Sequence, residues 1–168
     1  MLLLVLAVLV AASPAWAAQP PGAPTIEQLA RQADVVAIGE VASAVGEWTP
    51  GHTAIQTRIT LTATELLKGA PPSPRTTFTH LGGRVGDEAT AIGGGPEFHP
   101  GERVLVFLSR RADGSLRLTD LSYARFVIVR DAATGRDHAI RATGAQGADR
   151  VDLDQVRMLV RRALGETN

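Results

Sequence analysis

Between residues 34 and 141 the hydrophobic positions recur mostly with a period of two, as they do in β-strands. The alternation is clearest over 53–69, where Ile55, Ile59 and Leu61 lie on one face and mostly threonines on the other. One apolar and one polar face are typical of an antiparallel strand that is buried on one side. The segment 34–48 has the same period, and Gly39 within it indicates a bend or bulge.

Further strands are predicted downstream, and they are separated by turns rich in glycine and proline. They lie at residues 75–83, 103–111, 115–122, 124–131 and 132–141, the last of which contains a hairpin turn. Asp113-Gly114 and Thr134-Gly135 are the hairpin signals. Short strands with helices only at the two ends predict a mainly β fold, a small closed or partly open antiparallel OB-like β-barrel.

A helix is predicted at each end of this barrel. Thr25 and Gln28 have the spacing of a capping box, which opens a short helix that ends near Ala33. A C-terminal amphipathic helix spans 152–164, with Asp152 as its cap. Its apolar stripe is Leu153, Val156, Val160, Ala163 and Leu164, and its arginines Arg157, Arg161 and Arg162 lie off the stripe.

The segment 104–108, VLVFL, is apolar on both faces, so it must be covered on both sides. We expect the interior of the barrel to cover one side and the stripe of the C-terminal helix to cover the other. The three arginines of that helix are then expected to remain in water.

The first 17 residues resemble a secretory signal peptide. An apolar run is followed by Ala15-Trp16-Ala17, which has the small residues of a cleavage site, although no Lys or Arg precedes the run. We therefore expect an exported protein, periplasmic or extracellular, that retains no transmembrane segment after processing. The expected parts are a signal peptide (1–17), a proline-rich lead-in (18–24), the barrel domain (25–142), a glycine-rich linker (143–151) and the C-terminal helix (152–164).

Composition narrows the function classes. The 17 Lys and Arg residues balance the 17 Asp and Glu residues, and aromatic residues are few, so we expect no nucleic-acid partner. The chain has no cysteine, which excludes disulfides, thiol catalysis and cysteine-ligated zinc. We expect a monomer that needs no cofactor.

The stretch 80–111 holds two histidines, several carboxylates and clusters of glycine. A phosphate-binding loop is excluded because the glycines at 93–95 are followed by Pro96 and Glu97 rather than by Lys and Ser or Thr. No serine lies in the G-x-S-x-G motif of a nucleophile elbow. A metal site built on His80, His99 and the nearby carboxylates remains an alternative, although the two histidines lack the close spacing that is usual for zinc.

We interpret this stretch as a strand followed by a glycine-rich flap, and long loops of this kind often bind ligands. The predicted binding residues are Trp48, His80, Arg84, Asp87, Glu88, Glu97 and His99. The expected function is that of an exported, non-catalytic binding module, whose partner is an exported protein or an extracellular polymer. The alternative is a metal-binding protein or a metal-dependent hydrolase that uses the two histidines.

Four motifs carry a family resemblance: ADVVAIGEVASAV (33–45), ITLTATELLKG (59–69), FTHLGG (78–83) and FHPGERVLVFLSR (98–110). Together they resemble small exported bacterial proteins that look like the OB-type barrel of netrin modules and tissue inhibitors of metalloproteinases. The resemblance covers roughly Ile26 to Arg141 and implies the barrel fold. It transfers no functional residue, because those inhibitors act through an N-terminal cysteine that this chain lacks.

Overall fold

A computed structural model describes residues 22–70, 73, 75–142 and 148–166 of the 168-residue chain. The predicted signal peptide (1–17) lies outside the described residues, as do most of the proline-rich lead-in and the first half of the predicted linker. The described part is mainly β, as the sequence predicts.

Five strands form a closed barrel, which is consistent with the OB-like barrel that the alternation predicts. In their order around the barrel they are β1 (Val35–Trp48), β2 (Ile55–Lys68), β3 (Arg75–Leu81), β7 (Leu116–Leu118) and β6 (Arg103–Arg110). Neighbours are antiparallel except β3 and β7, which are parallel. The pairing of β1 with β6 closes the barrel, but it extends only from Val35 to Glu40 of β1. β1 is bulged at Gly39, as predicted.

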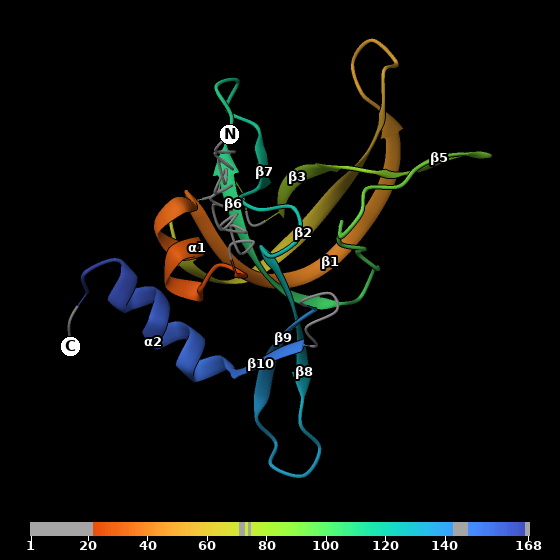
Figure 1. Cartoon of the computed structure of the whole chain (residues 1–168). Helices are drawn as coiled ribbons and strands as arrows, with labels where there is room; N and C mark the ends of the chain where they lie inside the picture. The colour runs from red at the N-terminus through yellow and green to blue at the C-terminus, as the bar shows by residue number, and fades with distance from the viewer. Residues whose placement is uncertain (1–21, 71–72, 74, 143–147, 167–168) are drawn as a thin grey trace, which may run out of the picture.

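The sheet continues past β6 through three more strands, which hang below the barrel in Figure 1. These are β8 (Arg125–Arg130), β9 (Asp137–Ala142) and β10 (Ala148–Asp152). The β8–β9 hairpin confirms the turn signal at Thr134-Gly135. The sequence does not predict β10, because most of its residues lie within the predicted glycine-rich linker (143–151).

The segment 104–108 is fully buried, as its apolar faces predict. The helix that contacts β6 is α1 (Ile26–Gln32), which begins with the predicted capping box. The C-terminal helix α2 (Leu153–Ala163) packs mainly against α1 and also contacts β2, β9 and β10. The stripe residues Leu153, Val156 and Val160 are buried, as predicted. The prediction that they cover the segment 104–108 is wrong, because α1 lies against β6 and α2 packs mainly on α1.

Arg157 of α2 is not left in water, contrary to our expectation. Its Nε and Nη2 atoms donate to the two carboxylate oxygens of Glu65 on β2, over 2.8 and 2.7 Å. This hydrogen-bonded pairing lowers the pKa of Glu65 below its usual value, although partial burial opposes the shift. Because the contact is bidentate, it fixes α2 against β2 in one orientation.

Removal of the Leu153 side chain should therefore destabilise the whole domain. Leu153→Ala is expected to reduce the free energy of unfolding by about 2–5 kcal/mol, because a buried leucine leaves a cavity. Met158→Ala on the exposed face of the same helix is the control, and it should change stability by no more than about 0.5 kcal/mol. Urea unfolding measures both variants. Equal, small effects would show that α2 is a detached tail.

Candidate functional site

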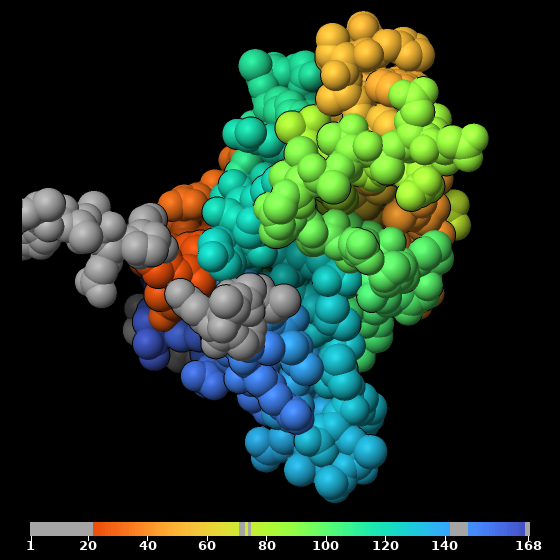
Figure 2. Space-filling view, turned by 45° about the vertical axis from the view of Figure 1, so that its right-hand side comes forward, coloured from red at the N-terminus to blue at the C-terminus, as the bar shows by residue number. Residues whose placement is uncertain are grey.

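A pocket of about 490 Å³ lies between one end of the barrel and the connection from β3 to β6. We call this connection, residues 82–100, the flap; it contains the small hairpin of β4 (Gly83–Val85) and β5 (Glu88–Thr90). Figure 2 shows the flap in green around a hollow, with the orange strand β1 beside it. The strands contribute Ala44, Gly46, Thr57, His80 and Leu81 to the lining, and the flap contributes residues 82–84, 89–92 and 95–99.

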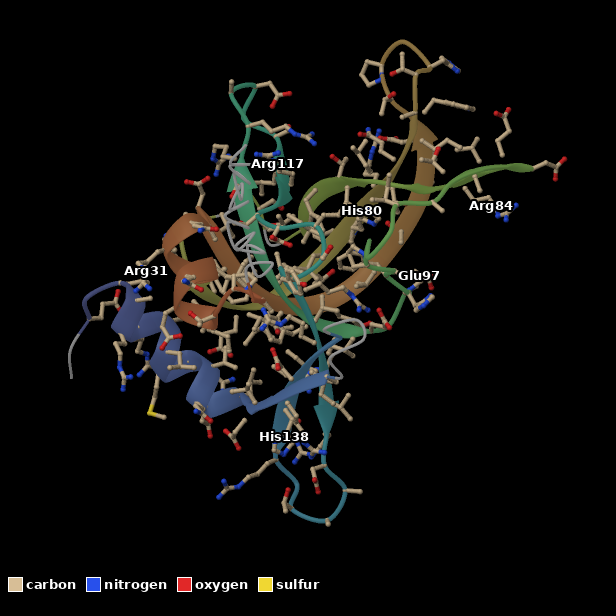
Figure 3. The ribbon with its side chains drawn as sticks, viewed as in Figure 1. Arg31, His80, Arg84, Glu97, Arg117 and His138 are labelled. Carbon is tan, nitrogen blue, oxygen red and sulfur yellow. The ribbon has the colours of Figure 1, made fainter. Side chains whose placement is uncertain are left out.

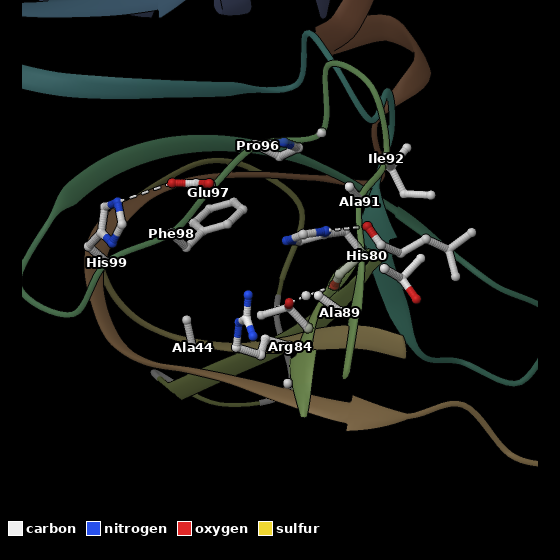
Figure 4. A pocket seen from close by; sticks show the side chains of 17 residues that line it. Ala44, His80, Arg84, Ala89, Ala91, Ile92, Pro96, Glu97, Phe98 and His99 are labelled. Atoms are coloured by element: carbon white, nitrogen blue, oxygen red, sulfur yellow. Dashed lines mark hydrogen bonds and ion pairs between the residues drawn. The ribbon is translucent and has the colours of Figure 1, made fainter. Parts of the chain in front are cut away.

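His80 is a buried polar side chain in the wall of this pocket, with only 9% of its surface exposed. Its Nδ1 lies 2.8 Å from the carbonyl oxygen of Leu81, so Nδ1 carries the proton and donates it to that oxygen. The lone pair of the neutral ring is then on Nε2, which points into the pocket (Figure 4) and has no hydrogen-bond partner among the described residues. The pocket therefore presents a fixed acceptor to whatever occupies it.

Burial keeps this imidazole neutral. Burial lowers the pKa of His80, the hydrogen bond to Leu81 offsets part of the effect, and the positive charge of Arg125 lowers the pKa further. The net pKa is below the usual 6.5 of histidine. Nε2 is consequently an acceptor at neutral pH rather than a charged donor.

Phe98 forms a second wall of the pocket and anchors the end of the flap. Its ring lies 5.7 Å from the ring of His80 and 5.5 Å from that of Phe78. The guanidinium of Arg125 lies over the same ring, 5.0 Å from its centroid. The flap is therefore packed onto the barrel core at this point.

Glu102 holds the segment that follows Phe98. Its Oε2 accepts a hydrogen bond from the backbone N–H of His99 at 3.0 Å and one from Nη2 of Arg125 at 2.6 Å. Burial raises the pKa of Glu102, but these two bonds outweigh that effect and the net pKa is lowered. The carboxylate therefore stays charged, and the end of the flap has a defined position at neutral pH.

Four of the predicted binding residues, His80, Arg84, Glu97 and His99, line the pocket. In Figure 4 His99 is drawn to the left and His80 to the right, with Arg84 below and between them. The exposed side chains of Glu97 and His99 are 3.8 Å apart, a separation at which a surface ion pair contributes little.

The other three predicted residues lie outside the pocket. Trp48 stacks on His52 at the turn after β1, with their ring centroids 5.3 Å apart. Asp87, in the turn between β4 and β5, and Glu88, the first residue of β5, are exposed and do not line the pocket.

Sequence reasoning missed the apolar and backbone parts of the site. The residue pattern does not predict that Phe98, Ala44, Gly46 and Thr57 line a pocket. The alternation of β1 does place Ala44 and Gly46 on one face. Nothing in that pattern shows that the flap folds back over this face.

The described residues include no group of three or more His, Asp or Glu side chains that could hold a metal ion. His80 and His99 share the pocket, but a third ligand does not join them. The geometry offers a neutral acceptor at His80 and a cation at Arg84, within partly apolar walls. The pocket can therefore offer an acceptor to a ligand's N–H or O–H group and attract an anionic group.

Comparison of the chain with protein-family models, curated proteins and solved structures found no match. The comparisons therefore give no support to the resemblance to netrin modules and to tissue inhibitors of metalloproteinases, and the structure supports only the OB-like barrel. Among the described residues, no helix is both long enough and apolar enough to cross a membrane.

Gly46 should be required for the position of the flap. A Cβ at this position would overlap the carbonyl oxygen of Arg84, so Gly46→Ala must displace β4. We expect a loss of about 1–3 kcal/mol in urea unfolding, as for other overpacked sites, and faster proteolysis within the flap.

Gly93→Ala is the matched control within the flap. Its added Cβ would meet nothing within 4 Å, and its φ does not require glycine. The account of the pocket is contradicted if the two alanine variants behave alike.

Proposed function

We propose that the protein is a non-catalytic binding module whose ligand occupies the pocket under the flap. The observation that carries the proposal is the buried His80 imidazole, whose Nε2 faces the pocket and has no partner among the described residues. Nε2 is not among the side-chain atoms that are sealed from solvent without a partner, so it can be reached from the pocket, and a ligand that donates a hydrogen bond to it can replace water there. Export after cleavage at Ala17 and a likeness to netrin-type barrels form part of this proposal.

The lining defines the chemistry of the ligand. Phe98, Leu81 and Ile92 supply apolar surface, so part of the ligand is apolar. The ligand also has an N–H or O–H group for Nε2 of His80. Arg84 lies at the pocket and forms no ion pair within the described part of the chain, so a negatively charged group on the ligand is favoured.

The metal-dependent alternative has less support. It needs His99 and at least one carboxylate to join His80, and the described residues form no such group. The close Glu97–His99 pair lies at the exposed rim, away from the buried ring. A binding module requires no rearrangement of these side chains.

The proposal is tested by NMR of ¹⁵N-labelled protein against a fragment set of single amino acids, short peptides and N-acetylated sugars. We expect at least one compound to shift the Nε2 resonance of His80 together with amides of the flap. His80→Phe removes the acceptor with a similar ring volume and should abolish the effect. His52→Gln, outside the pocket, should not.

Three results would overturn the proposal. In the first, no compound perturbs the pocket. In the second, the protein converts a compound to a product. In the third, zinc binds stoichiometrically and is lost on His99→Ala, which would establish the metal site instead.

A further inference from the structure

β1 extends beyond the closed part of the barrel, and among the described residues one edge of this extension is unpaired, beside the pocket. On this side β6 pairs with β1 only as far as Glu40, and the last backbone contacts are Val41 N–H to the carbonyl of Glu102 and Gly101 N–H to the carbonyl of Val41. β1 continues to Trp48, and from Ser43 onward no strand in the described part of the chain pairs with it on this side.

The pairing with β2 shows which backbone groups face the open side. The N–H of Thr49 donates to the carbonyl of Ala54, so these two residues form a hydrogen-bonded pair. In an antiparallel ladder such pairs alternate, and residues 47, 45 and 43 therefore also bond to β2. The N–H and C=O groups of Ala44, Gly46 and Trp48 point the other way, toward the open edge.

β2 supports this assignment independently. The N–H of Gly82 donates to the carbonyl of Ile55, which directs Ile55, Thr57 and Ile59 toward β3. The backbone groups of the alternate β2 residues 56, 58 and 60 therefore point toward β1, where their register partners are residues 47, 45 and 43.

This edge carries few of the features that usually prevent strand pairing. Natural proteins protect open edges with charges, prolines or a covering element. From Val41 to Trp48 β1 has no proline and one charged residue, Glu47, which forms an ion pair with Arg58 of β2, and Val45 is 57% exposed. The edge is thus suited to accept another strand.

The opposite side of the pocket makes this edge one wall of a groove. Ala44 and Gly46 line one wall, and Glu97, Phe98 and His99 line the other (Figure 4). Backbone groups on alternate residues recur every 7 Å or so, a spacing that an extended polypeptide matches. The backbone of Arg84 lies against the face of β1 at Gly46, where a Cβ would point, and its exposed cationic side chain is available to a carboxylate.

We propose that the partner is an extended peptide segment with an acidic group, which adds as a strand to β1 over Ala44–Trp48. Its backbone pairs with the open edge, and a side chain on the inward face enters the pocket toward His80. Its carboxylate pairs with Arg84, which Figure 3 labels to the right of His80. This inference rests on the proposed function, because it names the class of ligand for the same pocket.

The test uses a displayed library of random 12-residue peptides selected against the full chain. A selected peptide is then synthesised with single N-methyl groups at each position in turn. We expect N-methylation at alternate positions to weaken binding by about fivefold or more, because each methyl removes one backbone donor. Ala44→Pro should weaken binding similarly, whereas Ala44→Ser, which keeps the N–H, should stay within about twofold. Arg84→Gln should reduce the preference for acidic peptides.

Each other outcome overturns the strand-addition inference. If N-methylation has no alternating effect but His80→Phe abolishes binding, the pocket functions without strand addition. If no peptide is selected while other fragments shift the Nε2 resonance of His80, the proposed binding function is retained and the ligand is not a peptide. If the protein is a dimer that Ala44→Pro dissociates, a second copy fills the edge. The N-methyl series uses wild-type protein, so it decides the question even if Ala44→Pro fails to fold.

Discussion

The structure depends on how β1 is shared between two neighbours. β1 pairs with β2 along nearly its whole length. Its pairing with β6 is shorter and extends only from Val35 to Glu40. The irregularity between Val41 and Ser43 marks the point where β1 separates from β6. Bulges increase the local bend and twist of a strand, and this one directs the second half of β1 away from the barrel. The pocket and the open edge both lie in the space that this separation creates.

The flap closes part of that space, and it is held at both ends. The β4 backbone packs against Gly46, which has no Cβ to obstruct it, and Phe98 packs beside Phe78 under the guanidinium of Arg125. Glu102 fixes the chain that leads into β6. A site between two fixed ends is pre-organised, so a ligand loses little free energy in ordering it. The buried His80 supplies the directional contact within this frame.

The sequence predicted the elements well because their signals are local. Alternation identified the main barrel strands, and the side chains of Thr25 and Asp152 cap the two helices as expected. Alternation could not predict where the pairing of β1 with β6 ends. Strand pairing joins residues that are distant in the chain, and periodicity does not encode the partner. For the same reason the sequence indicates His80 only as a polar residue near glycines. It does not predict the hydrogen bond to Leu81 that directs Nε2 toward the pocket. Asp87 was selected by position alone, and it lies outside the pocket.

The central claim is that β1 has an open edge from Ala44 to Trp48. Amide hydrogen exchange of the free protein, followed residue by residue by NMR, tests it most directly. The account predicts alternating protection, with slow exchange at Ser43, Val45 and Glu47, whose amides bond to β2, and fast exchange at Ala44, Gly46 and Trp48. Uniform slow exchange over 43–48 would contradict it, because the second edge of β1 would then already be paired.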